Sequence, residues 1–243
     1  MSGTGHGKVR ACGPLAAALA GHAARRVFAP YLWRLAGERS GSTEAGYAAS
    51  ASVMVNALQA ARQLVGSDAI HVLVPEPTGA AFDALQRLAA MSRAYDLVAV
   101  VPGPVALAAA SGRALDDAQE DFEDLARAVL EAGCDVLAVH EPEPDADSAA
   151  SLRAMARLAA FYGARTLLLA PAAGAFALAA GFDAIDTGEP AAPPGGVAVA
   201  PAVADAPLPA STIVSSSWAQ PVGGADADWL RAAARQLRND SKE

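Results

Sequence analysis

Hydrophobic residues fall into short continuous runs that end at proline or glycine, and longer periodic stretches separate these runs. Continuous rather than alternating runs are typical of strands that are buried on both faces. The runs predict eight strands: Val27–Trp33, Ala69–Val74, Leu97–Val101, Val136–His140, Thr166–Leu169, Phe182–Ile185, Val197–Ala200 and Thr212–Val214.

Most of the stretches between these runs carry apolar residues at helical spacing. The stretch Leu115–Glu131 crowds its acidic residues into the first half, where the helix dipole favours negative charge. Asp226 is a candidate cap for a last helix that contains Trp229 and Leu237. The other predicted buried faces are Val53, Ala57, Ala60, Ala61 and Leu64 within Ala45–Leu64; Phe82, Leu85, Leu88 and Ala89; and Leu152, Met155, Ala159 and Tyr162.

Repeated alternation of strand and helix predicts an α/β fold with parallel pairing. Eight units in 243 residues match the size of a compact (β/α)8 TIM barrel, with a doubly wound open sheet as the alternative. The segment Glu189–Pro209 contains six prolines, so we expect degenerate crossovers near strands six and seven. The chain is interpreted as a single domain over residues 1–243, with residues 1–13 and 239–243 flexible.

Composition narrows the classes of binding partner and the cellular location that we expect. The net charge is −8 and the arginines are scattered, which argues against nucleic acid because phosphate backbones need a basic surface. No apolar run reaches the ~18 residues of a membrane helix, so no membrane partner is expected. Two cysteines make no disulfide framework and favour a reducing, cytoplasmic location. Lys8 and Arg10 before Leu15–Ala20 only weakly resemble an export signal, since that run is mostly alanine.

In a barrel, functional side chains gather where strands end and loops begin. The predicted ends carry Tyr31, Trp33 and Arg34 after the first strand, Glu76 after the second, His140 and Glu141 after the fourth, Asp186 after the sixth, and Ser215 and Trp218 after the eighth. The mouth of such a barrel would be acidic, and we expect a small-molecule substrate there.

Each candidate has a functional and a structural interpretation. Glu141 at a strand end suits a general base or an amine ligand, rather than a solvated loop. His140 suits acid–base chemistry near neutral pH and equally well a buried structural histidine. Arg34 suits a carboxylate clamp, or else an ion pair with Glu38 one turn later. The aromatic residues either line an apolar cavity or fill the core; these are Tyr31, Trp33 and Trp218.

Four further positions are assigned structural roles. Glu143 and Asp145 are expected to be solvated loop residues. His71 lies within a predicted strand and is interpreted as structural. Cys134 falls at a helix-to-strand turn, where stability is the expected role.

Several segments resemble the uroporphyrinogen decarboxylase and cobalamin-independent methionine synthase superfamily. Gly133–Asp135 leading into His140–Pro142 resembles its "AGAD…EP" element, and Pro102–Ala108 resembles its "GPxTLA" turn. Leu32–Gly37 is similar to the decarboxylase "MRQAG" stretch, with Arg34 on its arginine, and Trp218 is similar to the closing unit of the synthase branch. The resemblance implies a barrel that performs decarboxylation or methyl or alkyl transfer.

The chain departs from both active sites. The synthase branch binds zinc through a His-x-Cys after strand five, where this chain has Leu169–Ala173, and its later cysteine falls near Ser217. The resemblance therefore implies neither a metal nor a cofactor. The decarboxylase aspartate after strand two corresponds to Pro75, with Glu76 one residue later.

Two function hypotheses remain. The first is a metal-free enzyme acting on a small carboxylate-bearing molecule, in which Glu141 and His140 handle protons and Arg34 holds the carboxylate, with Tyr31, Trp33, Glu76 and Trp218 lining the site. The second is a non-catalytic relative that serves as a binding or partner protein. The sequence leaves a homodimer open.

Overall fold

The computed structural model describes residues 13–91, 93–143, 145–170, 181–187, 197–201, 212–216 and 223–240. At Glu44 and at residues 197–201 it describes the backbone alone. Trp218, residues 1–12 and most of Glu189–Pro209 lie outside these ranges, and so do the predictions made for them.

Eight parallel strands pair in the order β1-β8-β7-β6-β5-β4-β3-β2. Their bounds are Val27–Phe28 (β1), Ala69–Leu73 (β2), Asp96–Pro102 (β3), Val136–His140 (β4), Arg165–Leu169 (β5), Ala184–Asp186 (β6), Val197–Pro201 (β7) and Ile213–Ser215 (β8). The α/β class and parallel pairing predicted from the sequence are confirmed. Seven predicted strands agree to within two residues at each end, whereas β1 stops at Phe28, five residues before the predicted end.

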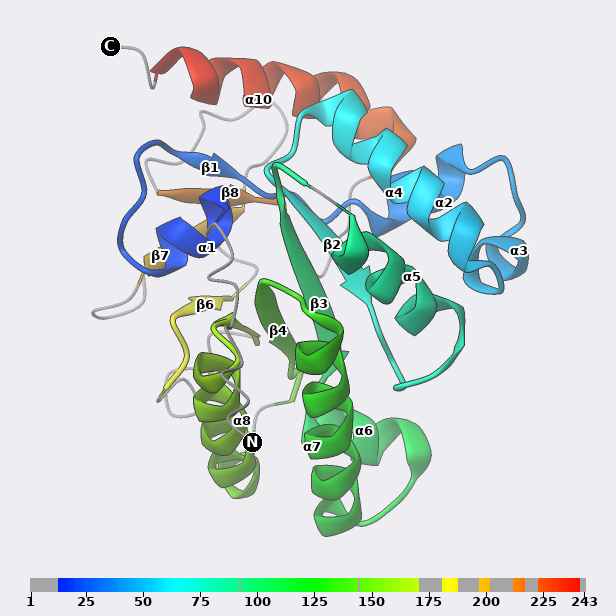
Figure 1. Cartoon of the computed structure of the whole chain (residues 1–243), viewed down its shortest axis with the longest axis vertical. Coiled ribbons are helices and arrows are strands. Elements are labelled where there is room, and N and C mark those ends of the chain that lie inside the picture. Colours follow the sequence, from blue (N-terminus) through cyan, green and yellow to red (C-terminus); the bar gives the residue numbers. More distant parts are fainter. Residues whose placement is uncertain are drawn as a thin grey trace, which may run out of the picture.

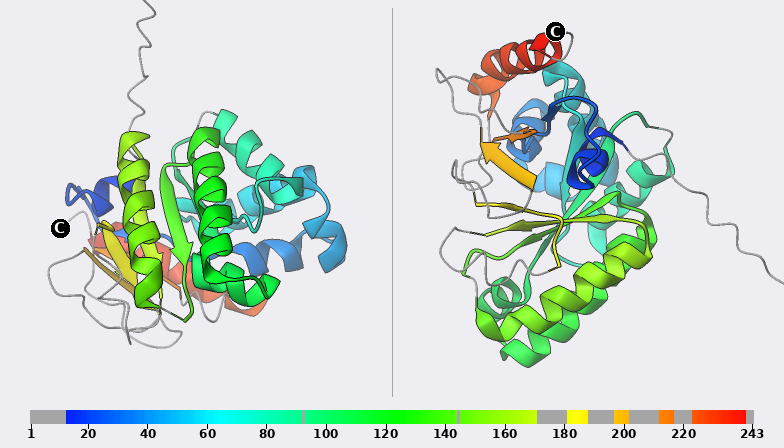
Figure 2. Two further views of the ribbon diagram at one scale, coloured as in Figure 1. Left: turned by 90° about the horizontal axis from the view of Figure 1, so that it is seen from below. Right: turned by 90° about the vertical axis from the view of Figure 1, so that its left-hand side faces the viewer.

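Helices surround the sheet, as Figures 1 and 2 show for α4, α5, α7, α8 and α10. The helical segments are α1 (Pro14–Leu19), α2 (Trp33–Arg39), α3 (Glu44–Ala48), α4 (Ala51–Val65), α5 (Gly79–Ala90), α6 (Pro104–Ser111), α7 (Leu115–Ala132), the short 3-10 turn η1 (Ala146–Ser148), α8 (Ala149–Phe161), a second turn η2 (Gly224–Asp226) and α10 (Ala227–Asp240).

Three helical predictions need correction. The single helix expected over Ala45–Leu64 is two helices, because the Ser50 hydroxyl accepts a hydrogen bond from the Val53 N–H at 3.4 Å and starts α4 afresh. Ala60 and Tyr162 are exposed, although the sequence placed both on buried helix faces. Helix α10 continues to Asp240, two residues into the predicted flexible tail, and Arg26 pairs with Asp240 at 3.3 Å.

Alternate strand residues enter two separate hydrophobic clusters, because successive side chains of a strand point to opposite faces. In β4, Val136 and Ala138 belong to one cluster, and Leu137 and Val139 belong to the other. The first cluster also contains the buried residues of α1, so we call this side of the sheet the α1 face. The outer helices cover the second side.

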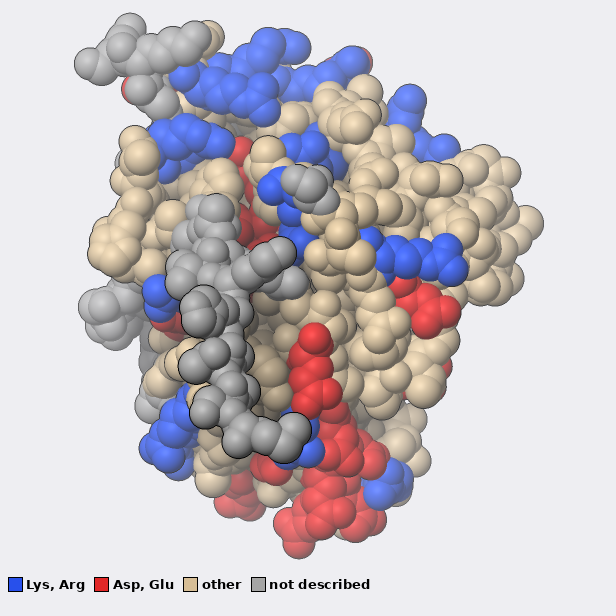
Figure 3. Space-filling model, viewed as in Figure 1, with Lys and Arg blue, Asp and Glu red and all other residues tan. Residues whose placement is uncertain are grey.

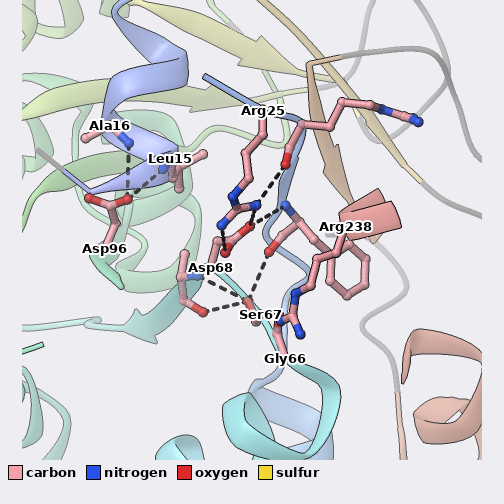
Figure 4. A network of polar contacts seen from close by, with 11 residues as sticks. Leu15, Ala16, Arg25, Gly66, Ser67, Asp68, Asp96 and Arg238 are labelled. Carbon is pink, nitrogen blue, oxygen red and sulfur yellow. Dashed lines mark hydrogen bonds and ion pairs between the residues drawn. The ribbon is translucent and has the colours of Figure 1, made fainter. Parts of the chain in front are cut away.

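Helix α1 lies on the α1 face near the amino ends of the strands, where it packs against β1, β3 and β5. The first residue of β3, Asp96, holds it there. The Asp96 carboxylate accepts hydrogen bonds from the N–H groups of Leu15 at 2.7 Å and Ala16 at 3.3 Å (Figure 4). Burial raises the pKa of Asp96 to about 6, although these N–H groups favour its charged form.

Aspartates just before β2, β4 and β6 accept backbone hydrogen bonds from the preceding strand. Just before β4, Asp135 accepts from the Leu97 N–H at 2.8 Å and pairs with Arg93 at 2.6 Å. Just before β6, Asp183 accepts from the Thr166 N–H at 2.7 Å. A carboxylate bonded in this way satisfies a donor that would otherwise be buried without a partner.

The same arrangement joins the starts of β1 and β2, which share no strand ladder among the described residues. The Asp68 carboxylate accepts from the Phe28 N–H at 2.9 Å and is held by both terminal nitrogens of Arg25 (Figure 4). In return, the Asp68 N–H donates to the Phe28 carbonyl at 2.8 Å. Asp135 and Leu97 make the same reciprocal pair between the laddered strands β3 and β4. Phe28 in β1 therefore lies beside Asp68, the residue before β2.

Candidate functional site

Four polar side chains from different parts of the sheet meet on the α1 face: Tyr31 beyond β1, His71 in β2, Asp186 at the end of β6 and Ser215 at the end of β8. The Tyr31 hydroxyl donates to Asp186 Oδ2 at 2.6 Å, and the Ser215 hydroxyl donates to the same oxygen at 3.3 Å. The rings of Tyr31 and His71 lie 4.6 Å apart. None of these residues is more than 2% exposed. We call them the buried polar cluster.

Backbone contacts place Tyr31 in this cluster. The Tyr31 N–H donates to the Ser216 hydroxyl at 2.9 Å, which ties the chain after β1 to the end of β8. Burial raises the pKa of Tyr31 well above its usual value, and the negative charge of Asp186 adds to this effect. The Tyr31 hydroxyl is therefore protonated at neutral pH and acts as a hydrogen-bond donor.

His71 is a neutral imidazole with one unused nitrogen. Burial lowers its pKa to about 3, although a hydrogen bond to the Pro30 carbonyl favours the charged form. Its Nδ1 atom is buried and has no hydrogen-bond partner. Because a buried polar atom without a partner costs free energy, this nitrogen needs an explanation.

His140 ends β4 on the α1 face, two residues beyond Ala138 of the same hydrophobic cluster. It is half-buried, and burial lowers its pKa. Its imidazole is therefore neutral at pH 7 and able to accept a proton. The prediction that Val136–His140 forms a strand between β3 and β5 is confirmed.

Glu141 follows β4, as predicted, but its carboxylate faces α6 rather than a solvent-filled mouth. It is fully buried and accepts from the N–H groups of Val105 at 3.2 Å and Ala106 at 3.0 Å. Burial raises its pKa to about 7, against the effect of these two N–H groups. Adjacent strand residues point to opposite faces, so His140 and Glu141 cannot both face the α1 side while the strand stays regular. The proton-handling role of Glu141 stays a prediction.

Gly103 makes the approach of Glu141 to α6 possible. A Cβ atom at Gly103 would overlap the Glu141 carboxylate, with the carboxyl carbon at 2.9 Å. Pro104 then occupies the first turn of α6, where its fixed φ suits a helix start. The turn Pro102–Ala108 is thus held by Glu141.

Arg34 lies in the first turn of α2, and its side chain is 62% exposed. It pairs with Glu38 at 2.9 Å, which is the structural alternative stated from the sequence. Glu38 also accepts from the Gly224 N–H at 2.5 Å, so this pair joins α2 to η2. Contact of Arg34 with a substrate carboxylate stays a prediction.

The remaining candidates lie either against the buried polar cluster or on the exposed surface. Trp33 is half-buried and its ring lies 5.1 Å from that of Tyr31, so the structure brings these two aromatic residues together. Glu76 is exposed in the turn between β2 and α5. Glu143 and Asp145 are exposed, as predicted. Their roles toward a ligand, like that of Trp218 outside the described ranges, stay predictions.

Asp186, Ser215 and His71 were not selected from the sequence as site residues, although a usable signal was present. Asp186 ends β6 two residues after the buried Ala184, and Ser215 ends β8 two residues after the buried Ile213. Alternation alone places both polar residues on the α1 face. Their contact with Tyr31 depends on how the strands are arranged, which the sequence pattern does not report.

Exposed charges separate on the surface. Figure 3 shows Lys and Arg gathered over α10 and α4, and Asp and Glu gathered at the lower end of α7. This lower end is the start of α7, which carries the exposed residues Asp116, Asp117, Glu120 and Asp121. A negative surface near the carboxyl ends of β3 and β4 raises the local concentration of cations.

In the described part of the chain, no three His, Cys, Asp or Glu side chains gather as metal ligands; residues 171–180, after β5, are not in that part. No helix within the described ranges has the length and apolar character needed to cross a bilayer. Neither protein-family models nor curated protein sequences match this chain.

Proposed function

We propose that the sheet closes into a (β/α)8 barrel of the uroporphyrinogen decarboxylase and methionine synthase type, with the α1 face as its interior. The strand order is that of a barrel opened between β1 and β2. The reciprocal bonds between Phe28 and Asp68 match those between the paired strands β3 and β4, which supports closure at this seam. Helix α1, held by Asp96, would then cover the bottom of the barrel.

Within this barrel, we propose a site for a small carboxylate-bearing molecule at the carboxyl ends of the strands. The buried polar cluster is the observation that carries this proposal. Aliphatic side chains would fill a barrel interior at lower cost, because buried polar groups must be compensated by hydrogen bonds. His140 on the same face supplies a neutral imidazole that accepts a proton.

The reaction is decarboxylation or methyl or alkyl transfer, as the resemblance implies. Arg34 would hold the substrate carboxylate after leaving Glu38, an exchange that costs little because the pair is exposed. The alternative is a binding protein without catalysis. The engagement of Glu141 with α6 favours this alternative, because its carboxylate is already used to accept hydrogen bonds from two backbone N–H groups.

Calorimetric titration of the full chain with a panel of small mono- and dicarboxylates tests the proposal. We expect at least one to bind, and Arg34→Ala to weaken it by about tenfold to a hundredfold. Release of carbon dioxide or of an alkylated product, lost in His140→Ala, would identify the enzyme. Binding without turnover would favour the alternative, and failure of every carboxylate to bind would reject the proposed ligand class.

A further inference from the structure

The outward sides of α7 and α8 form one surface of the molecule. The two helices stand side by side (Figures 1 and 2), and because each leads back to the start of the next parallel strand, they run in the same direction. Two contacts fix their levels: Ser151 donates to Glu123 at 3.2 Å, and Tyr162 donates to Glu131 at 3.2 Å. We call the exposed residues of these two helices the α7–α8 face.

The two helices of this face carry opposite charge. Helix α7 contains seven acidic residues and one arginine, Arg127, whereas α8 contains Arg153 and Arg157 and no acidic residue. Within the described ranges, Arg157 is exposed and pairs with no carboxylate. The outermost positions repeat at the same helical spacing and form one exposed stripe on each helix: Glu120, Asp124, Arg127 and Glu131 on α7, and Ala150, Ala154, Arg157 and Phe161 on α8.

An exposed aromatic pair ends α8. Phe161 is 83% exposed, the highest value among the exposed large hydrophobic residues of the described chain. Its ring meets that of Tyr162 edge to face, with the ring centres 5.6 Å apart. A single exposed apolar side chain is ordinary on a monomer. Phe161, however, lies one helical turn beyond Arg157 on the same stripe, so this face presents an aromatic anchor and an available charge together.

The face is complementary to a second copy of itself. A two-fold axis parallel to the helices places α8 of each copy on α7 of the other, so that the arginine stripe meets the acidic stripe twice. Arg157 lies between Ser151 and Tyr162, and therefore between the levels of Glu123 and Glu131 on α7. A two-fold axis across the helices would instead place α7 on α7, which brings two acidic stripes together at a cost.

We propose that this chain forms a two-fold homodimer through the α7–α8 face, with α8 of each copy packed on α7 of the other. Phe161 is the apolar anchor, Arg157 faces the acidic stripe, and the small side chains of Ala150 and Ala154 let the helices approach closely. The contact uses outer helices and none of the strand-end residues of the proposed ligand site. It therefore goes beyond the proposed function and is tested separately from it.

Sedimentation equilibrium of the full chain over a range of protein concentrations tests the dimer. We expect the mass of two chains, with a dissociation constant in the range of about 1–100 μM. Phe161→Ser should raise this constant by about tenfold to a hundredfold, because the anchor is lost from both copies. Met91→Ser is the matched control, since Met91 is another exposed large hydrophobic residue but follows α5, and it should change the constant less than about twofold.

A charge exchange tests the arrangement of the helices. Arg157→Glu and Glu131→Arg should each raise the dissociation constant by about threefold to tenfold, because like charges then meet. The double variant should recover most of the loss, since opposite charges face each other again. Tyr162→Phe removes the same hydrogen bond to Glu131 without changing any charge, and it should leave the constant nearly unchanged.

The outcomes are distinct. A single-chain mass at every concentration up to about 1 mM overturns the homodimer. A dimer that Phe161→Ser leaves intact overturns the α7–α8 face as its contact, and a mass that keeps growing beyond two chains overturns the closed two-fold arrangement. If the charge exchange recovers nothing, α8 does not pack on α7 of the other copy. None of these results depends on carboxylate binding, so the proposed function stands or fails independently.

Discussion

At the amino ends of the strands, Asp135 and Asp68 are each bonded to an arginine and to a backbone N–H of the neighbouring strand. At the carboxyl ends, Asp186 accepts from two hydroxyl groups, and the ring of one of them, Tyr31, packs against His71, whose Nδ1 has no hydrogen-bond partner. The amino-end carboxylates satisfy the backbone and join strands. The carboxyl-end carboxylate accepts from side-chain hydroxyl groups, and it adds polar atoms to an apolar face. We therefore expect stability to depend mainly on the contacts at the amino ends, while recognition at the carboxyl ends stays a proposal.

The largest expected effect tests the amino end. Asp135→Ala should lower the free energy of unfolding by about 3 kcal/mol, because it leaves the Arg93 guanidinium and the Leu97 N–H without their partner. Both charged side chains are well shielded, at 9% and 16% exposure, so solvent compensates little. Urea denaturation measures the change.

Asp124→Ala is the matched control, since its carboxylate pairs with Arg127 on the exposed surface of α7. Its cost should stay below about 0.5 kcal/mol. Equal costs for the two variants would remove the distinction between the ends, because the amino-end pairs would then be ordinary surface ion pairs.

The strand positions were predictable from sequence because parallel strands buried on both faces read as continuous apolar runs. The first strand was predicted too long for the same reason: Ala29, Tyr31 and Leu32 are buried although they follow β1. Ala60 was misplaced because alanine-rich helices offer several apolar faces, and the larger side chains Met54 and Leu58 occupy the buried one. Side-chain size decides between faces that hydrophobicity alone leaves equal.

The site was predictable only in part. The sequence selected strand ends but did not apply alternation to them, so His140 and Glu141 were given one shared environment. The structure separates them, with His140 on the α1 face and Glu141 against α6. Asp186 was visible as a strand end, but its contact with Tyr31 joins residues 155 positions apart. No local pattern reports such a contact.

The second prediction moves to the carboxyl end and concerns backbone space. Gly103→Ala should cost about 2 kcal/mol, because its methyl group would overlap the buried Glu141 carboxylate. The φ of Gly103 is −76°, so backbone strain contributes nothing and the effect comes from the overlap. Thermal denaturation measures it. If the overlap is the cause, Gly103→Ala should cost much less in a chain that also carries Glu141→Ala. If the cost of the double variant equals the sum of the two single costs, the overlap is not the explanation.

The third prediction uses pH to compare buried carboxylates at the two ends. The folded-state pKa of Glu141 is about 7, above its ordinary value of 4.5. The folded state therefore binds the proton more tightly, and the resulting stability is complete below about 4.5 and is lost as pH rises through 7. Glu141→Gln removes this dependence. Its stability relative to the parent should rise by about 1–2 kcal/mol between pH 4.5 and pH 8.

Asp96 is the amino-end counterpart, with a pKa of about 6 in place of 3.8. Asp96→Asn should show the same sign over a lower window, with the gain complete near pH 7. Urea denaturation at several pH values follows both variants. Between pH 6 and pH 8, the stability of the parent should fall by more than the stability of Glu141→Gln. An equal fall in the two proteins would contradict a buried Glu141 that titrates in this range.

The smallest stability effect is expected at Arg34, and it decides between its two interpretations. Its side chain is 62% exposed and its partner Glu38 is 42% exposed, so Arg34→Ala should change the free energy of unfolding by less than about 0.5 kcal/mol. Arg113→Ala is the control, because Arg113 is also exposed and paired with carboxylates but lies on a different helix connection. If Arg34 binds a ligand carboxylate, its loss weakens binding of that ligand by about tenfold to a hundredfold, while loss of Arg113 leaves binding unchanged. If the two variants bind alike and melt alike, Arg34 serves only to pair with Glu38, and recognition at the carboxyl ends rests on the buried polar cluster alone.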